Sequence, residues 1–137
     1  MDEPGGPAPL GSQDFLYVPS TDVAADLGFY EGVLGGEVVF AIEAMETRVA
    51  EVRLTEDGPR LLLADHLHGE AAVFVYRVED LDAALADLES KGLQSEGRFG
   101  IPHGPIATLR APGGQRMALY QLTRPEADEH FAGRRDF

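Results

Sequence analysis

The sequence predicts an α+β fold built from two copies of a βαβββ unit, whose curved mixed sheets surround a cavity. Three observations predict it: a strand–helix segment occurs twice, an aspartate precedes each helix, and three strand-like segments follow each helix. The two strand–helix segments lie at 15–36 and 73–92. Internal repetition of this kind indicates one structural unit used twice. A chain of 137 residues suits one domain made of both copies.

The helix of each unit is expected to begin after an aspartate and to end at glycine. Asp22 and Asp80 are placed as N-cap residues, whose carboxylates accept hydrogen bonds from first-turn N–H groups. Gly35-Gly36 and Gly92 are typical of helix ends. Each helix has one predicted apolar face, made of Val23, Leu27, Tyr30 and Leu34 in the first and of Leu81, Ala84, Leu85 and Leu88 in the second.

Three strands are predicted after each helix, with turn residues between them. They span 37–45, 47–55 and 60–66 in the first unit, and 93–101, 106–112 and 115–123 in the second. The chain therefore divides into an acidic, Pro- and Gly-rich lead without stable structure at 1–13, a first unit at 14–68, a second at 69–123, and a tail with a short helix at 124–137.

Three motifs occur in a fixed order along the chain: Asp22 with Phe29-Tyr30 and "VLGG" behind it, then "VEDLDAALADLESKG", then the ending "APGGQRMALYQL". Over about residues 14–123 this set resembles the vicinal oxygen chelate superfamily, which includes glyoxalase, extradiol dioxygenases and bleomycin-resistance proteins. The resemblance implies two sheets curled around a cavity and a homodimer. It also implies metal ligands at matching positions of both units, commonly a His that opens each unit and a Glu in its last strand.

Carbon side chains occupy the positions where the resemblance implies metal ligands. Phe15 and Val73 open the two units, and Leu62 and Ala118 stand in the last strands. A metal ion needs at least three converging oxygen, nitrogen or sulfur ligands, and none of these four side chains has a lone pair to donate. We therefore predict no metal, no other cofactor and no catalytic residue at this centre.

The alternation of side chains along a strand predicts which residues line the cavity. Phe15 and Tyr17 are expected to face it, and Leu16 and Val18 to face the helices. With His103 at the cavity mouth, the predicted ligand-binding residues are Phe15, Tyr17, Val73, Arg77, His103, Arg116, Ala118 and Tyr120. Aromatic faces and arginine donors suit a small aromatic or conjugated ligand that carries a carboxylate or carbonyl.

Other polar residues leave alternatives open. His66 and His68 put two imidazoles on one side of an extended segment, although a solvated linker is the favoured interpretation. His103 is either a catalytic base or an ordinary turn residue. Glu43 and Glu51 stand on adjacent predicted strands and could pair, but two solvated charges on an outer face are favoured. His130 is expected at the surface of the tail.

Composition excludes several function classes. The formal net charge of −13 repels phosphate backbones and disfavours nucleic-acid binding, while it would attract a cationic small molecule. Without cysteine there is no disulfide or thiolate chemistry. No apolar run approaches the roughly 18 residues of a membrane span, and the lead lacks the pattern of a signal peptide. A cytoplasmic protein is predicted.

The favoured function is metal-independent capture of a small molecule, such as an aromatic or cationic natural product, in the manner of antibiotic-sequestering bleomycin-resistance proteins. Enzyme activity is disfavoured but stays open as an alternative: a lyase, isomerase or dioxygenase with a noncanonical metal site. A structural or regulatory module with a filled cavity is the third possibility. A homodimer is expected in every case, because each unit leaves strand edges that need cover.

Overall fold

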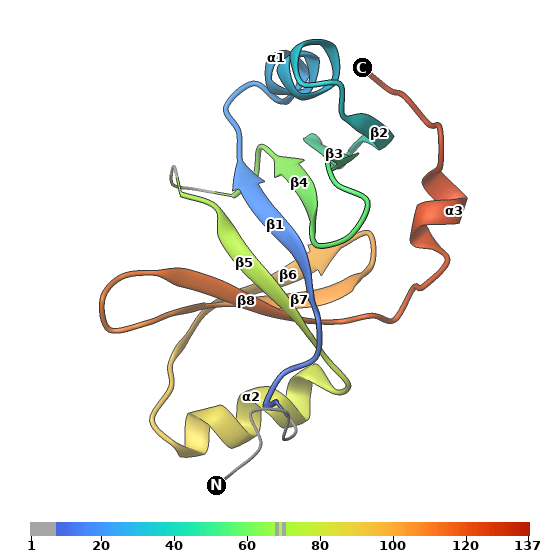
Figure 1. Cartoon of the computed structure of the whole chain (residues 1–137). Helices are drawn as coiled ribbons and strands as arrows, with labels where there is room; N and C mark the ends of the chain where they lie inside the picture. Colours follow the sequence, from blue (N-terminus) through green and yellow to red (C-terminus); the bar gives the residue numbers. More distant parts are fainter. Residues whose placement is uncertain (1–7, 68, 70) are drawn as a thin grey trace, which may run out of the picture.

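Two βαβββ units join side by side into one curled, mixed sheet of eight strands that forms a half-barrel (Figure 1). The computed structural model describes residues 8–67, 69 and 71–137. The predicted lead is thus described only from residue 8 onward, and His68 lies outside the described residues. The order of strands across the sheet is β2-β3-β4-β1-β5-β8-β7-β6.

The elements of the first unit, in chain order, are β1 (Gln13–Pro19), α1 (Val23–Gly28), the π-helical turn η1 (Phe29–Val33), β2 (Glu37–Ala44), β3 (Thr47–Arg53) and β4 (Arg60–Ala64). Those of the second are β5 (Val73–Val78), α2 (Leu81–Ser90), β6 (Ser95–Ile101), β7 (Gly104–Arg110) and β8 (Arg116–Gln121). The short helix α3 (Ala127–Phe131) follows in the C-terminal segment, which we define as residues 124–137. The α+β fold class predicted from the repeat is confirmed.

The two units have the same internal pairing. In each, the first and last strands are parallel: β1 pairs with β4, and β5 pairs with β8. The units join where β1 and β5 run antiparallel, with Tyr17 opposite Val73. The opening strands of both units therefore lie at the middle of the sheet, which is why their inward side chains meet at its centre.

Both helices begin at the predicted caps. The side chain of Asp22 accepts a hydrogen bond from the Ala25 N–H, and that of Asp80 accepts one from the Ala83 N–H, each at 3.0 Å. The first helix differs from the prediction at its end, where the wider turn η1 changes the phase of the side chains. Leu34 is therefore 53% exposed and does not belong to the buried face.

The predicted alternation in β1 is confirmed. Leu16 and Val18 pack with the buried face of α1, whereas Phe15 and Tyr17 belong to the cluster on the concave face of the sheet. That concave cluster is the main core. It receives side chains from all eight strands, and Phe131 of the C-terminal segment packs against it. A third cluster lies under α2 and includes Leu81 and Leu85.

The C-terminal segment runs along the edge strand β2 and places α3 at the open side of the half-barrel (Figure 1). Backbone bonds hold it there: the Ala41 N–H donates to the Arg134 carbonyl at 2.8 Å, and the Asp136 N–H donates to the Ala41 carbonyl at 2.7 Å. Phe131 packs against Phe40, with ring centroids 5.6 Å apart. The tail therefore covers an edge that would otherwise present unpaired backbone groups.

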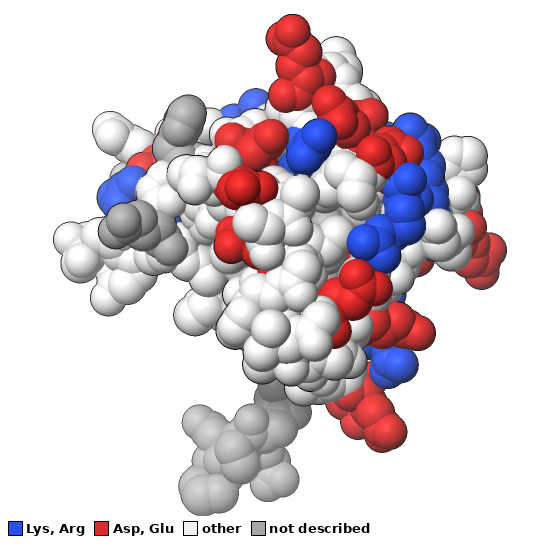
Figure 2. Space-filling model, turned by 90° about the horizontal axis from the view of Figure 1, so that it is seen from above, with Lys and Arg blue, Asp and Glu red and all other residues white. Residues whose placement is uncertain are grey.

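The surface is acidic, and many of its basic side chains are paired with acids. Arg53 contacts Glu37 and Arg135 contacts Glu31, at 2.8 and 3.2 Å. Figure 2 shows the face seen from above, where a strip of basic side chains lies along one edge with acidic side chains next to it. Among the described residues, no helix has the length and apolar character needed to cross a membrane.

Candidate functional site

The centre of the concave face is filled with apolar side chains. Phe15, Leu62, Val73 and Ala118, which stand where the resemblance implies metal ligands, are buried in one apolar cluster, none more than 5% exposed. A cation at this centre would lose its water without gaining replacement ligands. These positions therefore do not fit a metal ion.

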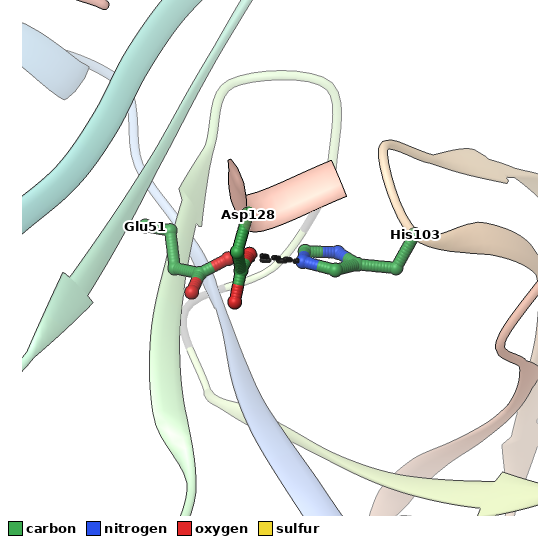
Figure 3. A group of neighbouring side chains, drawn as sticks. All are labelled: Glu51, His103 and Asp128. Carbon is green, nitrogen blue, oxygen red and sulfur yellow. Dashed lines mark hydrogen bonds and ion pairs between the residues drawn. The ribbon is translucent and has the colours of Figure 1, made fainter. Parts of the chain in front are cut away.

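A polar cluster lies on the same concave face, nearer to β2 and the C-terminal segment. It brings together Glu51 of β3, His103 of the β6–β7 turn and Asp128 of α3 (Figure 3). His103 Nε2 lies 2.8 Å from Asp128 Oδ1 and 3.0 Å from Glu51 Oε1. The N–H of His103 is directed at Asp128, so Glu51 Oε1 receives no hydrogen bond despite its short distance.

Arg60 of β4 holds the outer side of this cluster. Its Nη1 donates to Glu51 Oε2 at 2.9 Å and to Asp128 Oδ2 at 2.7 Å. One guanidinium nitrogen thus fixes both carboxylates and leaves their other oxygens turned toward the imidazole. Glu51 is fully buried, whereas the side chains of Arg60 and Asp128 are about one third exposed.

The β6–β7 turn is built so that His103 points into this cluster. The backbone at Gly104 has φ +155°, and a Cβ there would lie 2.0 Å from the Gln121 carbonyl oxygen, so glycine lets the turn approach β8. The Arg124 guanidinium donates to the carbonyls of Ile101 and Pro102, both at 2.6 Å. The beginning of the C-terminal segment therefore fixes the turn that carries His103.

Mutual contacts set the protonation of the cluster. Burial acts to lower the pKa of His103, but the hydrogen bond to Asp128 and the close contact with Glu51 outweigh it and raise the pKa from 6.5 to about 9. Burial raises the pKa of Glu51, and the close contact with His103 and the hydrogen bond from Arg60 offset this only in part. Burial also acts to raise the pKa of Asp128, yet its hydrogen bond with His103 prevails and lowers it. His103 is consequently a cation at neutral pH.

A cavity of about 550 Å³ adjoins the cluster. Its wall includes Pro102 and Ala127, the residues just before His103 and Asp128, and Val49, two residues before Glu51. Most of the lining is apolar; the full set is Ile42, Ala44, Met45, Thr47, Val49, His66, Gly100, Ile101, Pro102, Arg124, Glu126, Ala127, His130 and Phe131. A mostly apolar pocket with a few polar groups is the usual form of a small-molecule site.

His66 lines the cavity, and Tyr17 of the concave face holds its ring in place. The hydroxyl of Tyr17 forms a short hydrogen bond with His66 Nε2. Burial, reinforced by the charge of Asp65, raises the pKa of Tyr17, so this phenol stays protonated. The ring of Phe99 lies 5.5 Å from that of His66, edge to face.

The structure separates the predicted ligand-binding residues into three groups. Phe15, Tyr17, Val73, Ala118 and Tyr120 are buried in the concave core. The hydroxyls of the two tyrosines are hydrogen-bonded: that of Tyr120 donates to Asp14, and that of Tyr17 is bonded to His66. Their part in binding a ligand stays a prediction.

The two predicted arginines lie away from the cavity described above. Arg77 contacts Asp14 at 3.5 Å, and Arg116 contacts Glu96 at 3.4 Å. His103, the last of the predicted set, is buried in the polar cluster and packs against Phe15 with ring centroids 4.5 Å apart. Its neighbour Pro102 lines the cavity, whereas His103 itself is not among the lining residues, so its part in binding a ligand stays a prediction.

Sequence reasoning missed the other members of the cluster. The favoured interpretation of Glu43 and Glu51 as two solvated charges is correct for Glu43, which is exposed and pairs with Arg48. It is wrong for Glu51, which is fully buried on the concave face because its side chain alternates with its neighbours in β3. Strand parity could have indicated this burial. No comparable signal was available for Asp128, which was placed in a surface tail.

Comparisons with known proteins identify the family. The family model described as Glyoxalase/Bleomycin resistance protein/Dioxygenase superfamily matches residues 12–119. No curated protein sequence matches the chain. The resemblance stated from the motifs is therefore confirmed at the level of the superfamily.

Solved structures share the fold at low sequence identity. Methylmalonyl-CoA epimerase from Mycobacterium tuberculosis has a TM-score of 0.71 and 18% identity, over 90% of this chain and 97% of that one. A variant of the Streptomyces coelicolor methylmalonyl-CoA epimerase, in complex with 2-nitronate-propionyl-CoA, has a TM-score of 0.66 and 23% identity, over 84% and 99%. Hypothetical protein BH1468 from Bacillus halodurans C-125 has a TM-score of 0.69 and 14% identity, over 82% and 95%.

These neighbours correct one expectation from the sequence. Enzyme activity was disfavoured because the implied metal ligands are missing, but the neighbours include epimerases, which are enzymes built on this fold. The absence of lone pairs at four positions shows only that these four side chains do not fit a metal ion. It does not exclude catalysis by other residues of the concave face, so the step from a missing metal to a missing activity was wrong.

Proposed function

The chain belongs to the glyoxalase/bleomycin resistance protein/dioxygenase superfamily, and within it we propose that the protein is an enzyme of the isomerase kind. It would transfer a proton on a small organic substrate that has an acidic C–H beside a carbonyl group. The observation that carries the proposal is His66, a wall residue of the cavity whose ring is held by the buried hydroxyl of Tyr17.

His66 supplies the acid–base group that such a reaction needs. An imidazole can both accept and return a proton near neutral pH, and a positioned acid or base contributes about 10²- to 10⁴-fold to a rate. Tyr17 is a positioning residue: its protonated hydroxyl fixes one ring nitrogen of His66 and so orients the imidazole. The proton leaves the substrate carbon for the ring nitrogen of His66 that is not bonded to Tyr17. The planar enolate then turns over in the cavity, and return of the proton to its opposite face gives the isomer.

The apolar wall favours the substrate over water. Ile42, Val49 and Phe131 line the cavity beside His66, so a bound carbonyl compound is partly removed from solvent. Methylmalonyl-CoA, which is named in a complex of a structural neighbour, has the required C–H between two carbonyl groups. It is therefore the first probe, although the substrate class includes smaller acids of the same kind.

Solvent-exchange NMR tests the proposal. Methylmalonyl-CoA and small 2-oxo acids are incubated with the protein in D₂O, and loss of the α-proton signal is followed over time. We expect catalysed exchange for at least one probe, a loss of about 100-fold in His66→Gln, and a smaller loss in Tyr17→Phe. Tyr76→Phe, on the side of the sheet under α2, is the matched control and should keep the wild-type rate.

Two outcomes would contradict this function. One is the absence of exchange for every probe; the other is exchange that His66→Gln leaves unchanged. Binding of a probe in a thermal-shift assay without any turnover would instead support capture without chemistry.

The homodimer and the cytoplasmic location also remain proposals. The edge strand β2 is covered by the chain's own C-terminal segment, so β6 is the edge available for a second copy. Light scattering after size-exclusion chromatography measures the mass in solution, and a monomer at all concentrations would contradict the dimer.

A further inference from the structure

We propose that Glu51, His103 and Asp128 form a binding site for one divalent first-row transition metal ion. This site differs in place and in residues from the four carbon-filled positions at the centre of the sheet. It also goes beyond the proposed function, which assigns no step to a metal. The ligand atoms are Glu51 Oε1, His103 Nε2 and Asp128 Oδ1, which all lie within 4.8 Å of one another.

The spacing of these atoms matches one face of a coordination sphere. Ligands about 2.1 Å from an ion and at right angles to one another lie about 3.0 Å apart. His103 Nε2 lies 2.8 Å from Asp128 Oδ1 and 3.0 Å from Glu51 Oε1. Two of the three distances therefore match this spacing, and the third, between the two carboxylate oxygens, lies within the 4.8 Å that one ion can bridge.

A second observation points to a ligand at this place. Glu51 is fully buried, and its Oε1 atom faces the imidazole without a hydrogen-bond partner. Oε1 forms an ion pair with His103 Nε2 at 3.0 Å, but a buried carboxylate oxygen without a hydrogen bond is costly, since most buried polar atoms are hydrogen-bonded. A cation bound to Oε1 would satisfy it, and the same ion would replace the Nε2 proton of His103, which is released to solvent on binding.

Arg60 gives the site the outer support that metal centres use. Its Nη1 binds Glu51 Oε2 and Asp128 Oδ2, the oxygens that point away from His103. Each carboxylate is thereby held with its free oxygen toward the ion position, in the way that outer hydrogen bonds orient metal ligands. The positive charge of Arg60 also leaves the site less anionic than two carboxylates alone.

The donor set decides the class of ion. One imidazole nitrogen with two carboxylate oxygens suits zinc, manganese, iron, cobalt or nickel as divalent ions. Calcium and magnesium prefer oxygen ligands alone. Because the three ligands come from β3, the β6–β7 turn and α3, the ion would join the C-terminal segment to the sheet beside the cavity.

Metal binding is tested directly on the full chain. Protein stripped with a chelator is titrated with Co²⁺ and, separately, Zn²⁺; binding is followed by visible absorption of cobalt, by calorimetry, and by elemental analysis after dialysis. We expect one ion per chain and a rise in the thermal midpoint. Asp128→Asn and His103→Gln should each weaken binding at least tenfold.

Two controls separate this site from the cavity. His130→Gln changes α3 without touching a ligand, and His66→Gln removes the proposed acid–base group; both should bind the ion as the wild type does. Asp128→Asn changes a partly exposed side chain, and circular dichroism verifies its fold. Less than one tenth of an ion per chain, or equal binding by the wild type, Asp128→Asn and His103→Gln, would overturn the proposal, whatever His66→Gln does to proton exchange.

Discussion

The protonation of His103 predicts a specific fall in stability with pH in chelated, metal-free protein. Its pKa is 6.5 in an unfolded chain and about 9 in the folded one. The folded state therefore binds more protons between these values, and the free energy of unfolding decreases as pH rises. The contribution is fully present below pH 6.5 and is lost by the time the pH has passed 9.

The magnitude follows from the two pKa values. Each pH unit between 6.5 and 9 corresponds to about 1.4 kcal/mol for one proton, which gives about 3 kcal/mol for His103. Solvent screening is small, because the side chain is only 5% exposed. The groups that face it are Glu51 from β3 and Asp128 from α3, with Arg60 behind them.

The other acids of the cluster have different windows. The lowered pKa of Asp128 gives stability that is lost as pH falls below its ordinary 3.8. The raised pKa of Glu51 favours the folded state at low pH, and this advantage is lost as pH rises from 4.5 toward the folded value. Comparing the free energy of unfolding of the wild type with that of His103→Gln at each pH separates the contribution of His103 from that of Glu51.

Urea unfolding at several pH values between 6 and 9.5, with chelator present, measures the effect. We expect the free energies of wild type and His103→Gln to differ most near pH 6.5 and to converge by about 3 kcal/mol toward pH 9. Parallel curves over this range would refute the assignment of the cation to His103.

Two further predictions concern how the cluster is built. Gly104→Ala should destabilise the fold by about 2–4 kcal/mol, because φ is +155° and the added Cβ would meet the Gln121 carbonyl; Gly100→Ala, which meets nothing within 4 Å, should cost about 1 kcal/mol or less in the same denaturation assay. Deletion of residues 124–137 should lower the thermal midpoint and promote concentration-dependent association in analytical ultracentrifugation, because it uncovers the edge of β2. A truncated chain that stays monomeric with an unchanged midpoint would show that the segment does not protect this edge.

The parts of the fold that depend on local patterns could be predicted from the sequence. Asp22 and Asp80 cap their helices as expected, and the alternation at Phe15 and Tyr17 predicted the concave face. These features depend on neighbours a few residues apart, where periodicity and capping chemistry are visible. The phase change after Gly28 was not predictable in this way, because a π-helical turn has no distinct residue pattern.

The candidate site was predictable only in part because its members come from distant segments. His103 was chosen for its turn, and strand parity in β3 was available for Glu51. Asp128, however, reaches the cluster only because the tail pairs with β2 through Ala41 and packs Phe131 on Phe40. Arg60 likewise opens β4, where sequence alone does not distinguish a solvated charge from a clamp on two carboxylates.

The charge balance of the cluster makes the C-terminal segment part of the site. Glu51 comes from the first unit and His103 from the second, and both are buried. With Arg60 they form a set of two potential cations and one acid. Asp128 supplies the second acid and contacts both cations, at 2.7 and 2.8 Å.

Removing one partner of a buried ionic group leaves an uncompensated charge, which costs several kcal/mol. Without Asp128, the two units alone would therefore leave the positive charges of His103 and Arg60 compensated by Glu51 only. It follows that Asp128 compensates the charge of the buried His103, and that the C-terminal segment which carries Asp128 is part of the site beside the cavity.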